Sequence, residues 1–337
     1  MRFNSVLPAR NAMTRLKRKK DLPAETLGDL RFGTPVEVAE YRAERLRADT
    51  VIEAGAGAGF QTRSFASRAK RVIAIDPDAE RLGRASFGEN VTAIVGDALD
   101  PAVIARARGL VEGSALVFLD PERPPKAAER TLSEIKQDPL LFVERWSAVT
   151  EDIAIELAPF LKEIPFACER EYTSFEGELN RLTVYLGGLR RCDVSVVRLP
   201  QGERIAHSGP LPAFEDAAVD GAYILEPDRA LEHAGLCPLA LPPAVACMLG
   251  KRRAYLTDEL PRNGFFKAYA VLERTDREGL PDALSSLGCG TPILHGSLAQ
   301  GEQAALLKEL KPACTGTRRL HVFFSDIILI CEKITTN

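Results

Sequence analysis

The sequence lacks the features that mark several classes of protein. It contains no apolar run of about 18 residues, so no membrane-spanning helix is expected. Its seven cysteines are scattered and form no C-x-x-C pair, which argues against a disulfide framework and a zinc site. The four histidines lie far apart, without metal-ligand spacing (His207, His233, His295, His321). We therefore expect a cytoplasmic protein without a bound metal.

Charge is low overall but unevenly placed. The chain has 337 residues, 45% of them hydrophobic and 27% charged, with a net charge of −3. This composition is ordinary for a globular protein, and the length allows two domains. Residues 1–20 hold seven Lys or Arg and no acid, without the apolar core of a secretory signal. Such an arm can neutralise nucleic-acid phosphates, act as a targeting peptide, or be a solvated terminus.

A glycine-rich turn follows the first apolar run. Residues 51–59 read Val-Ile-Glu-Ala-Gly-Ala-Gly-Ala-Gly, so Glu53 precedes the alternating Gly55, Gly57 and Gly59. Glycine lets the backbone approach a ligand closely. A dinucleotide-binding turn reads G-x-G-x-x-G, but Phe60 occupies its third glycine position. The Glu53 carboxylate suits a cationic ligand rather than a phosphate. A glycine turn without a ligand is the alternative.

Acidic residues end the next apolar runs. Asp76 ends the run 72–76, Asp97 follows 91–95, and Asp120 follows 115–119. A further β-branched run covers 153–157. Short runs of this kind are typical of parallel strands buried on both faces. Open α/β sheets bind ligands at the carboxyl ends of such strands. Asp76 lies 21 residues after Gly55, close to the ~20-residue spacing of acids that accept ribose hydroxyls.

The remaining segments predict an α/β protein in two parts. Thr34 to Glu37 reads as a capping box before a helix. A helix is expected around 127–136, and Trp146 is expected to pack against the sheet. The runs 166–175 and 179–186, joined by a glycine-containing turn, predict a β-hairpin. From about residue 213 a second α/β unit is expected, with one closing strand over 320–331.

Together these motifs resemble the class I S-adenosylmethionine (SAM) methyltransferases, in a family with a carboxy-terminal THUMP-like domain. The acid-x-G-x-G-x-G turn resembles motif I of the superfamily, while Leu119 to Arg123, 225–228, 254–257 and 269–273 match in order. The resemblance covers roughly residues 31–333. It implies a seven-stranded Rossmann-like sheet ending in an antiparallel hairpin, followed by a smaller α/β domain. We expect a basic arm over 1–30, a methyltransferase domain over 31–212 and a THUMP-like domain over 213–337.

The resemblance also implies the cofactor and its contacts. SAM would lie against the glycine turn, with Glu53 orienting its amino-acid end. Asp76 would bind the ribose, and Asp97, followed by Ala98, would bind the adenine amino group. The family is presumed to act on RNA, so a transfer- or ribosomal-RNA base is the expected substrate. In 293–311, where basic residues are expected, this sequence has only Lys308 and Lys311, which shifts RNA binding toward the amino-terminal arm.

The loop Asp120-Pro121-Glu122-Arg123 is the expected catalytic segment. Methyl transfer depends mainly on positioning an in-line nucleophile, and a carboxylate at Asp120 can hold or deprotonate it. The loop is similar to the Asp-Pro-Pro-Arg loop of some transfer-RNA methyltransferases, and Arg123 can pair with a phosphate or lie on a base. A helix cap at Asp120 is the alternative. Two other functions stay open: a methyltransferase acting on a protein or small molecule, and a non-catalytic SAM-fold module.

Overall fold

The computed structural model describes residues 34–85, 87–121, 137–161, 163–248, 253–296 and 301–334. The described residues form two compact units, one up to residue 151 and one from residue 152 onward. The basic arm, the helix expected at 127–136 and Arg123 lie outside the described residues. The domain boundaries drawn from the sequence, after residues 30 and 212, stay predictions.

The first unit is built on parallel strands. Its strands follow the order β3-β2-β1-β4, and each adjacent pair is parallel and in continuous register. Every residue of β1 is buried, which explains why the strand is apolar apart from Thr50 and Glu53. The elements are α3 (Val36–Arg45), β1 (Thr50–Ala54), α4 (Phe60–Ala66), β2 (Arg71–Asp76), α5 (Ala79–Arg84), β3 (Val91–Val95), α6 (Pro101–Arg108), β4 (Ala115–Leu119) and α7 (Pro139–Trp146).

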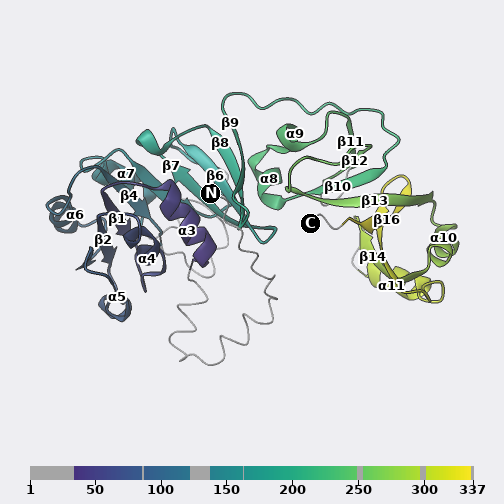
Figure 1. Ribbon diagram of the computed structural model, residues 1–337, viewed down its shortest axis with the longest axis horizontal. Helices are drawn as coiled ribbons and strands as arrows, with labels where there is room; N and C mark the ends of the chain where they lie inside the picture. The colour runs from purple at the N-terminus through teal and green to yellow at the C-terminus, as the bar shows by residue number, and fades with distance from the viewer. Residues whose placement is uncertain are drawn as a thin grey trace, which may run out of the picture. The chain divides into compact units, whose positions relative to one another are not determined.

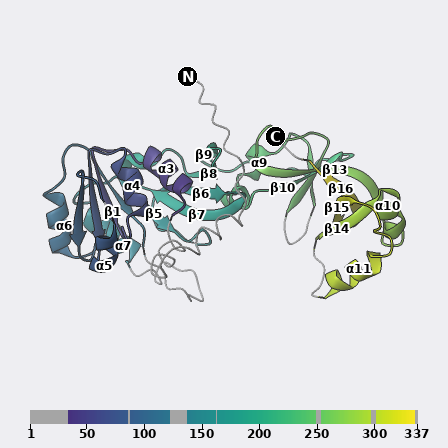
Figure 2. The ribbon, with the colours of Figure 1, turned by 60° about the horizontal axis from the view of Figure 1, so that its bottom comes forward.

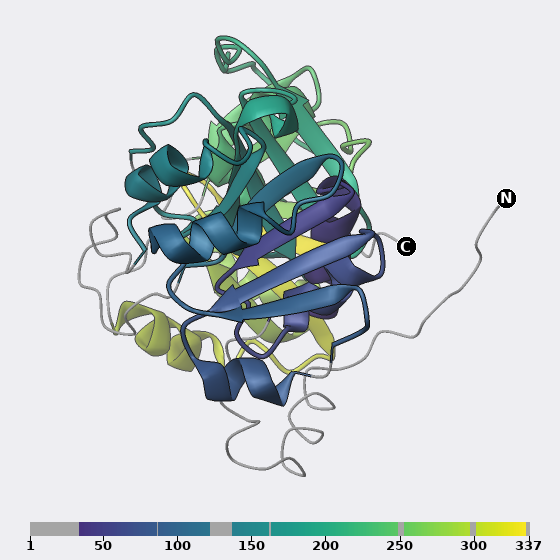
Figure 3. The same ribbon diagram turned by 90° about the vertical axis from the view of Figure 1, so that its left-hand side faces the viewer.

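Helices lie on both faces of these strands (Figure 3). Helix α3 packs against α4, and α6 packs against α7. The ring of Phe65 in α4 meets Phe118 of β4 edge-on, with 5.6 Å between the ring centroids. Trp146 is fully buried, and its indole Nε1 donates to the carbonyl oxygen of Ala98 at 2.9 Å. Trp146 is therefore a core residue, and its expected packing against the sheet stays a prediction.

The capping box expected at Thr34 is wrong. Helix α3 begins at Val36, and Pro35 occupies the N-cap position without a side-chain hydrogen bond. The amides of Val38 and Ala39 donate instead to the carbonyl oxygen of Pro35, at 3.1 and 2.9 Å. Because the helix begins one residue later than expected, the Thr34 side chain does not cap it.

The second unit begins with strands in the order β5-β7-β6-β8-β9. They cover β5 (Ile153–Leu157), β6 (Glu169–Phe175), β7 (Glu178–Tyr185), β8 (Val194–Leu199) and β9 (Glu203–His207), with a short 3₁₀ helix η2 (Gly187–Leu189) after β7. The hairpin prediction is confirmed by the antiparallel pairing of β6 and β7. Its turn residues Glu176 and Gly177 have φ values of 55° and 81°, the left-handed backbone that a two-residue hairpin turn requires.

The resemblance implies fewer strands than the chain has before residue 212. It ends the sheet at the hairpin and implies seven strands, but β1 to β9 are nine. Strand β8 pairs parallel with β6, and β9 pairs antiparallel with β8. Strand β8 comes from the run Val-Ser-Val-Val-Arg-Leu at 194–199 and β9 from residues 203–207, both of which the sequence interpretation left unassigned.

A second sheet of seven strands follows, in the order β11-β12-β10-β13-β16-β15-β14. Helices α10 and α11 lie beside the strands at one end of it (Figures 1 and 2) and bury Leu284 and Leu306 against β14 and β15. The elements are β10 (Tyr223–Pro227), α8 (Arg229–Ala234), α9 (Cys237–Ala240), β11 (Val245–Met248), β12 (Ala254–Thr257), β13 (Phe266–Thr275), α10 (Leu280–Ser286), β14 (Cys289–His295), α11 (Glu302–Leu310), β15 (Arg318–Phe324) and β16 (Ile328–Lys333).

The single closing strand expected over 320–331 is wrong. The segment forms two strands, β15 and β16, which pair antiparallel. The turn between them is closed by Ser325, whose hydroxyl donates to the carbonyl oxygen of Ile327 at 2.6 Å. Both halves are apolar because both are buried, so hydrophobicity alone does not mark the turn.

Two features are absent from the described residues. Every helix in those ranges is too short or too polar to cross a bilayer. The same residues contain no group of three or more His, Cys, Asp or Glu side chains arranged to hold a metal ion.

Candidate cofactor and active site

The glycine turn between β1 and α4 adopts a backbone that favours glycine at each of its three glycines. Gly55, Gly57 and Gly59 have φ values of 83°, 54° and 75°, which other residues rarely adopt. Space is also restricted: a Cβ at Gly55 would overlap the carbonyl oxygen of Asp120, and one at Gly59 would lie 2.6 Å from the Phe87 ring. Both conformation and space therefore explain the alternating glycines of the motif.

Asp76, at the end of β2, holds this turn in place. Its side chain is only 4% exposed. The Oδ2 atom accepts the Gly57 N–H at 2.7 Å, and Oδ1 accepts the Asp78 N–H at 2.9 Å. A carboxylate has about four acceptor positions, so these bonds leave capacity for a ribose hydroxyl. The structure thus gives Asp76 a role in ordering the turn that the sequence interpretation did not include.

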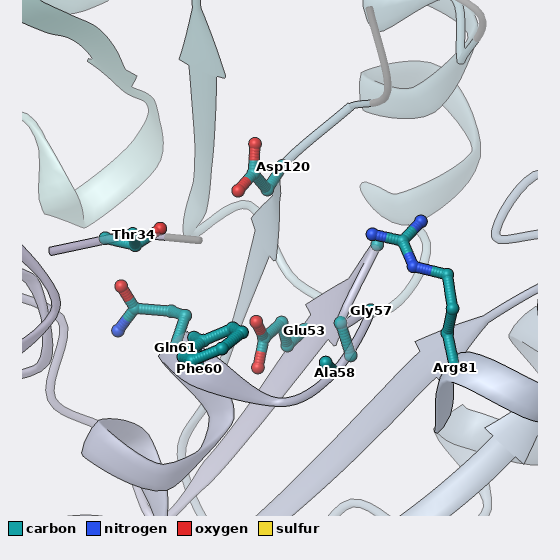
Figure 4. A pocket seen from close by; sticks show the side chains of 10 residues that line it. Thr34, Glu53, Gly57, Ala58, Phe60, Gln61, Arg81 and Asp120 are labelled. Carbon is teal, nitrogen blue, oxygen red and sulfur yellow. The ribbon is translucent and has the colours of Figure 1, made fainter. Parts of the chain in front are cut away.

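A small cavity opens above the turn (Figure 4). Its volume is about 70 Å³, well below the roughly 300–1,000 Å³ of sites that enclose a whole ligand of drug size. It can therefore receive one end of a cofactor rather than all of it. It is lined by Thr34, Glu53, Gly55, Ala56, Gly57, Ala58, Phe60, Gln61, Arg81 and Asp120.

Glu53 is the most unusual residue of this cavity. It is 1% exposed, and its Oε2 atom has no hydrogen-bond partner among the described residues. Burial raises the pKa of Glu53 to about 8, and the nearby charges of Asp120 and Asp76 add to the effect, against the Thr62 hydroxyl and the Arg42 guanidinium. A buried polar atom without a partner destabilises the protein by about 1–3 kcal/mol. A ligand that brings a positively charged donor would remove this penalty.

Arg42 and Gln61 form a supporting network beside Glu53. Arg42 Nη1 donates to Gln61 Oε1 at 2.8 Å, and Gln61 Nε2 donates to the Ala39 carbonyl oxygen at 3.1 Å. The Arg42 guanidinium also lies 4.5 Å from the centroid of the Phe118 ring. These contacts join α3 to α4 and to β4. They fix the wall of the cavity and place a buried cation near Glu53.

Asp120 lies directly after β4 and lines the same cavity as Glu53 (Figure 4). Its backbone N–H donates to the Ala54 carbonyl oxygen at 3.0 Å, which ties the start of this loop to the end of β1. The residues from 122 to 136 lie outside the described residues, so the helix-cap alternative for Asp120 stays open. Pro121 is buried next to it.

The structure gathers only some of the residues predicted for the site. Glu53, Gly55, Gly57 and Asp120 line the cavity, whereas Gly59, Asp76, Asp97 and Ala98 do not. Asp97 is exposed, and its Oδ1 accepts the Leu99 N–H at 2.8 Å. Ala98 is buried, and its carbonyl oxygen accepts the Trp146 indole N–H. The adenine contact assigned to Asp97 and Ala98 stays a prediction.

Four residues of the cavity were missed by the sequence interpretation: Thr34, Phe60, Gln61 and Arg81. Phe60 and Gln61 directly follow the glycine turn, so their position next to motif I was an available signal. Arg81 comes from α5, and one of its terminal nitrogens would lie 3.3 Å from a Cβ at Gly57. Nothing in the local sequence around Arg81 indicates this long-range approach.

Comparisons with known proteins agree with this fold. A "putative methyltransferase" from Porphyromonas gingivalis W83 superposes with a TM-score of 0.70 at 13% identity, covering 91% of this chain and 82% of that one. A "putative methyltransferase" from Streptococcus mutans in complex with SAH matches less well, with a TM-score of 0.32 at 14% identity over 46% of this chain and 99% of that one. No protein-family model and no curated protein matches the chain.

The match to the Porphyromonas gingivalis protein defines the class of fold. The chain has the mixed α/β architecture of that methyltransferase-like structure over most of its length. An identity of 13% shows a common fold and leaves the reaction to be argued from the site.

Proposed function

We propose that the chain is a SAM-dependent methyltransferase acting on an RNA base. The observation that carries the cofactor assignment is the buried Glu53 carboxylate, whose Oε2 lacks a partner in a cavity bounded by the glycine turn. The residues present fit the amino-acid end of SAM, because its ammonium is a charged donor of the kind that Glu53 lacks. When bound, SAM supplies a methyl group attached to a sulfonium.

Each residue of the site has a defined part in this reaction. Glu53 holds the cofactor ammonium, while the backbone at Gly55 and Gly57 allows its close approach. Asp76 keeps the turn in place and accepts a ribose hydroxyl. Asp120 accepts a hydrogen bond from the attacking nitrogen or oxygen, or takes its proton, at the carboxyl end of a central strand. Arg123 pairs with a substrate phosphate or lies on the base.

The RNA part of the proposal is supported by the basic residues of positions 1–20 and by the order of segments that resembles RNA-modifying relatives. The same order supports a THUMP-like assignment for 213–337. A methyltransferase acting on a protein or small molecule is the competing function, and labelling decides between the two.

Calorimetry tests cofactor binding. The purified chain is expected to bind SAM and S-adenosylhomocysteine, and Gly57→Arg, which fills the turn, is expected to abolish both. Absence of binding by the parent protein, or unchanged binding by the variant, would refute the cofactor site.

Tritiated SAM added to total RNA and to total protein extracts tests the substrate class. Label in RNA supports the proposal, and label in protein alone contradicts it. Deleting residues 2–20 should flatten the slope of log affinity against log salt, by about 0.7 for each phosphate that the arm no longer neutralises. An unchanged slope would exclude the arm as a source of RNA affinity.

A further inference from the structure

The second unit contains a larger cavity that the proposed chemistry does not use. Its volume is about 390 Å³, within the roughly 300–1,000 Å³ of ligand sites. It lies where β10 runs into α8, where β13 begins and where β16 ends. All of its lining residues belong to the second unit.

Five basic side chains line this cavity. Arg198 pairs with the Glu203 carboxylate, and the other four come from separate segments. Arg229 begins α8, Arg253 precedes β12, Lys267 lies on β13 and Lys333 ends β16. All four residues are exposed, and none forms an ion pair with a carboxylate within the described residues. Basic side chains that line one cavity without carboxylate partners are suited to an anionic ligand.

Five acidic residues also line the cavity, and two of them already accept hydrogen bonds from neighbouring side chains. Glu226 is 8% exposed and accepts the Tyr269 hydroxyl at 3.2 Å. Asp228 accepts the Ser174 hydroxyl at 2.5 Å and the Ala230 N–H at 2.8 Å. The exposed carboxylates Glu176 and Glu178 belong to the β6–β7 turn, and Glu232 lies on α8. Lys267 and Lys333 therefore lie on strands of the second sheet and Arg253 directly before one, whereas Glu176 and Glu178 lie at the β6–β7 hairpin.

The walls of the cavity are joined by direct contacts. The bond from Ser174 to Asp228 links β6 to the start of α8, which packs on β6, β7 and β8. On the other side, the Gly264 N–H donates to the Glu203 carboxylate at 3.0 Å, and Arg198 pairs with the same carboxylate at 3.1 Å. Phe265 and Phe266, 1% and 6% exposed, form an apolar base. These hydrogen bonds and the ion pair hold the walls of the cavity in place.

We propose that this cavity is a nucleotide-binding subsite for the RNA substrate, in which Arg229, Arg253, Lys267 and Lys333 hold a backbone phosphate. The carboxylates of the β6–β7 turn accept hydrogen bonds from the 2′-hydroxyl or from base amino groups of the same nucleotide. The inference rests on the proposed function, and it places RNA affinity in the second unit, where the sequence suggested a shortage of basic residues. Phosphate contacts of this kind position a nucleic acid without reading its sequence.

The test measures binding of the full-length protein to a fluorescein-labelled single-stranded RNA oligonucleotide over a range of salt concentrations. The double variant Arg253→Gln/Lys267→Gln removes two cations from the cavity. The matched control Lys308→Gln/Lys311→Gln removes two exposed cations that do not line it. Removing two cations that neutralise phosphates should reduce the salt slope by about 1.4 and weaken binding on the order of tenfold or more at low salt. The control should bind like the parent.

The outcomes separate this subsite from the proposed function. Equal RNA binding by the two double variants, with matching melting temperatures, overturns the subsite while RNA methylation by the parent still stands. Weaker binding by the cavity variant alone, with SAM affinity measured by calorimetry unchanged, supports it. If the parent binds no RNA at low salt and labels only protein with tritiated SAM, both the subsite and the RNA substrate are wrong, whereas SAM binding is untouched.

Discussion

Buried carboxylates occur in both units, but they differ in how many hydrogen-bond and ion-pair partners the protein gives them. In the second unit, Glu169 and Glu171 are 0% and 1% exposed. Glu169 accepts hydrogen bonds from Ser195 at 2.7 Å and from the Arg191 amide at 2.9 Å, and Glu171 accepts the Tyr185 hydroxyl at 2.8 Å. Arg204 pairs with both carboxylates, at 2.6 and 3.2 Å.

Glu53 in the first unit is buried to the same degree but is left with an unpartnered oxygen and a pKa raised to about 8. Protein donors thus satisfy Glu169 and Glu171, whereas one oxygen of Glu53 keeps its acceptor capacity. The comparison separates carboxylates that stabilise the fold from one that is available to a ligand.

The largest effect is expected when the ion pairs of Arg204 with Glu169 and Glu171 are broken. Arg204→Ala leaves two buried carboxylates without their shared cation, and removing one partner of a buried ion pair costs about 3–5 kcal/mol. Chemical denaturation should show this loss of unfolding free energy, while SAM binding to the folded fraction stays unchanged. A loss below about 1 kcal/mol, as for exposed pairs, would mean that these carboxylates do not need Arg204.

The second prediction concerns the neighbour of Glu53. Asp120→Ala should lower the methyl-transfer rate by about 10²–10⁴-fold, the usual contribution of a positioned acid or base. The melting temperature and SAM affinity should change little, because the contact with β1 is made by the Asp120 backbone. A large fall in melting temperature with retained activity would assign Asp120 to the fold. Glu89→Ala, at an exposed carboxylate that does not line the cavity, serves as the control for rate.

The third prediction uses the pH dependence of stability. In the unfolded chain Glu53 ionises near pH 4.5, whereas in the fold its pKa is about 8. The folded state therefore binds the proton more tightly, so Glu53 makes stability fall as pH rises from about 4.5 through about 8. Each pKa unit is worth about 1.4 kcal/mol.

Glu53→Gln, which cannot ionise, should therefore be more stable than the parent at pH 8.5, on the order of a few kcal/mol. The two should be nearly equal at pH 4. The same variant should lose SAM affinity. Equal stability of variant and parent across this range would mean that Glu53 is not held in its neutral form.

The smallest expected effect is the release of a proton from Glu53 when SAM binds. At pH 6.5 Glu53 is protonated in the unliganded protein, because its pKa is about 8. A bound ammonium favours the carboxylate, so SAM binding should release up to about one proton. Calorimetry in two buffers with different ionisation enthalpies measures this release. Identical enthalpies in both buffers would show that Glu53 does not ionise on binding, and Gly57→Arg gives the baseline.

The sequence predicted features that depend on neighbouring residues, but it did not predict contacts between residues far apart in the chain. The five strands from 51 to 157 were found because each is a short apolar run, although β3 proved largely accessible rather than buried. Glu53 and Asp120 were found because strand-end acids stand out beside glycine and proline. The link from Arg42 to Gln61 joins residues 19 positions apart on two helices, and no local pattern marks it. Arg81 reaches the turn from α5 for the same reason.

The errors have a common cause. Strands β15 and β16 are both buried, so the apolar run 320–331 hid the turn at Ser325. Four of the five cations of the second cavity come from positions spread over 229–333. A count of basic residues within one short window could not find them, because β13 and β16 bring them together only in the folded sheet.

The tight fit of Gly55 beneath the Asp120 carbonyl has an evolutionary consequence. The glycine turn and the loop that begins at Asp120 share one contact surface, and the Asp120 amide is also bonded to the Ala54 carbonyl oxygen. A larger residue at position 55 would displace the loop, and a changed loop would alter which residues the turn tolerates. Substitutions at 55 and 120 should therefore show strong epistasis, since residues in contact couple by about 0.5–3 kcal/mol. A lineage carrying this fold could change its substrate only along paths that keep glycine at 55.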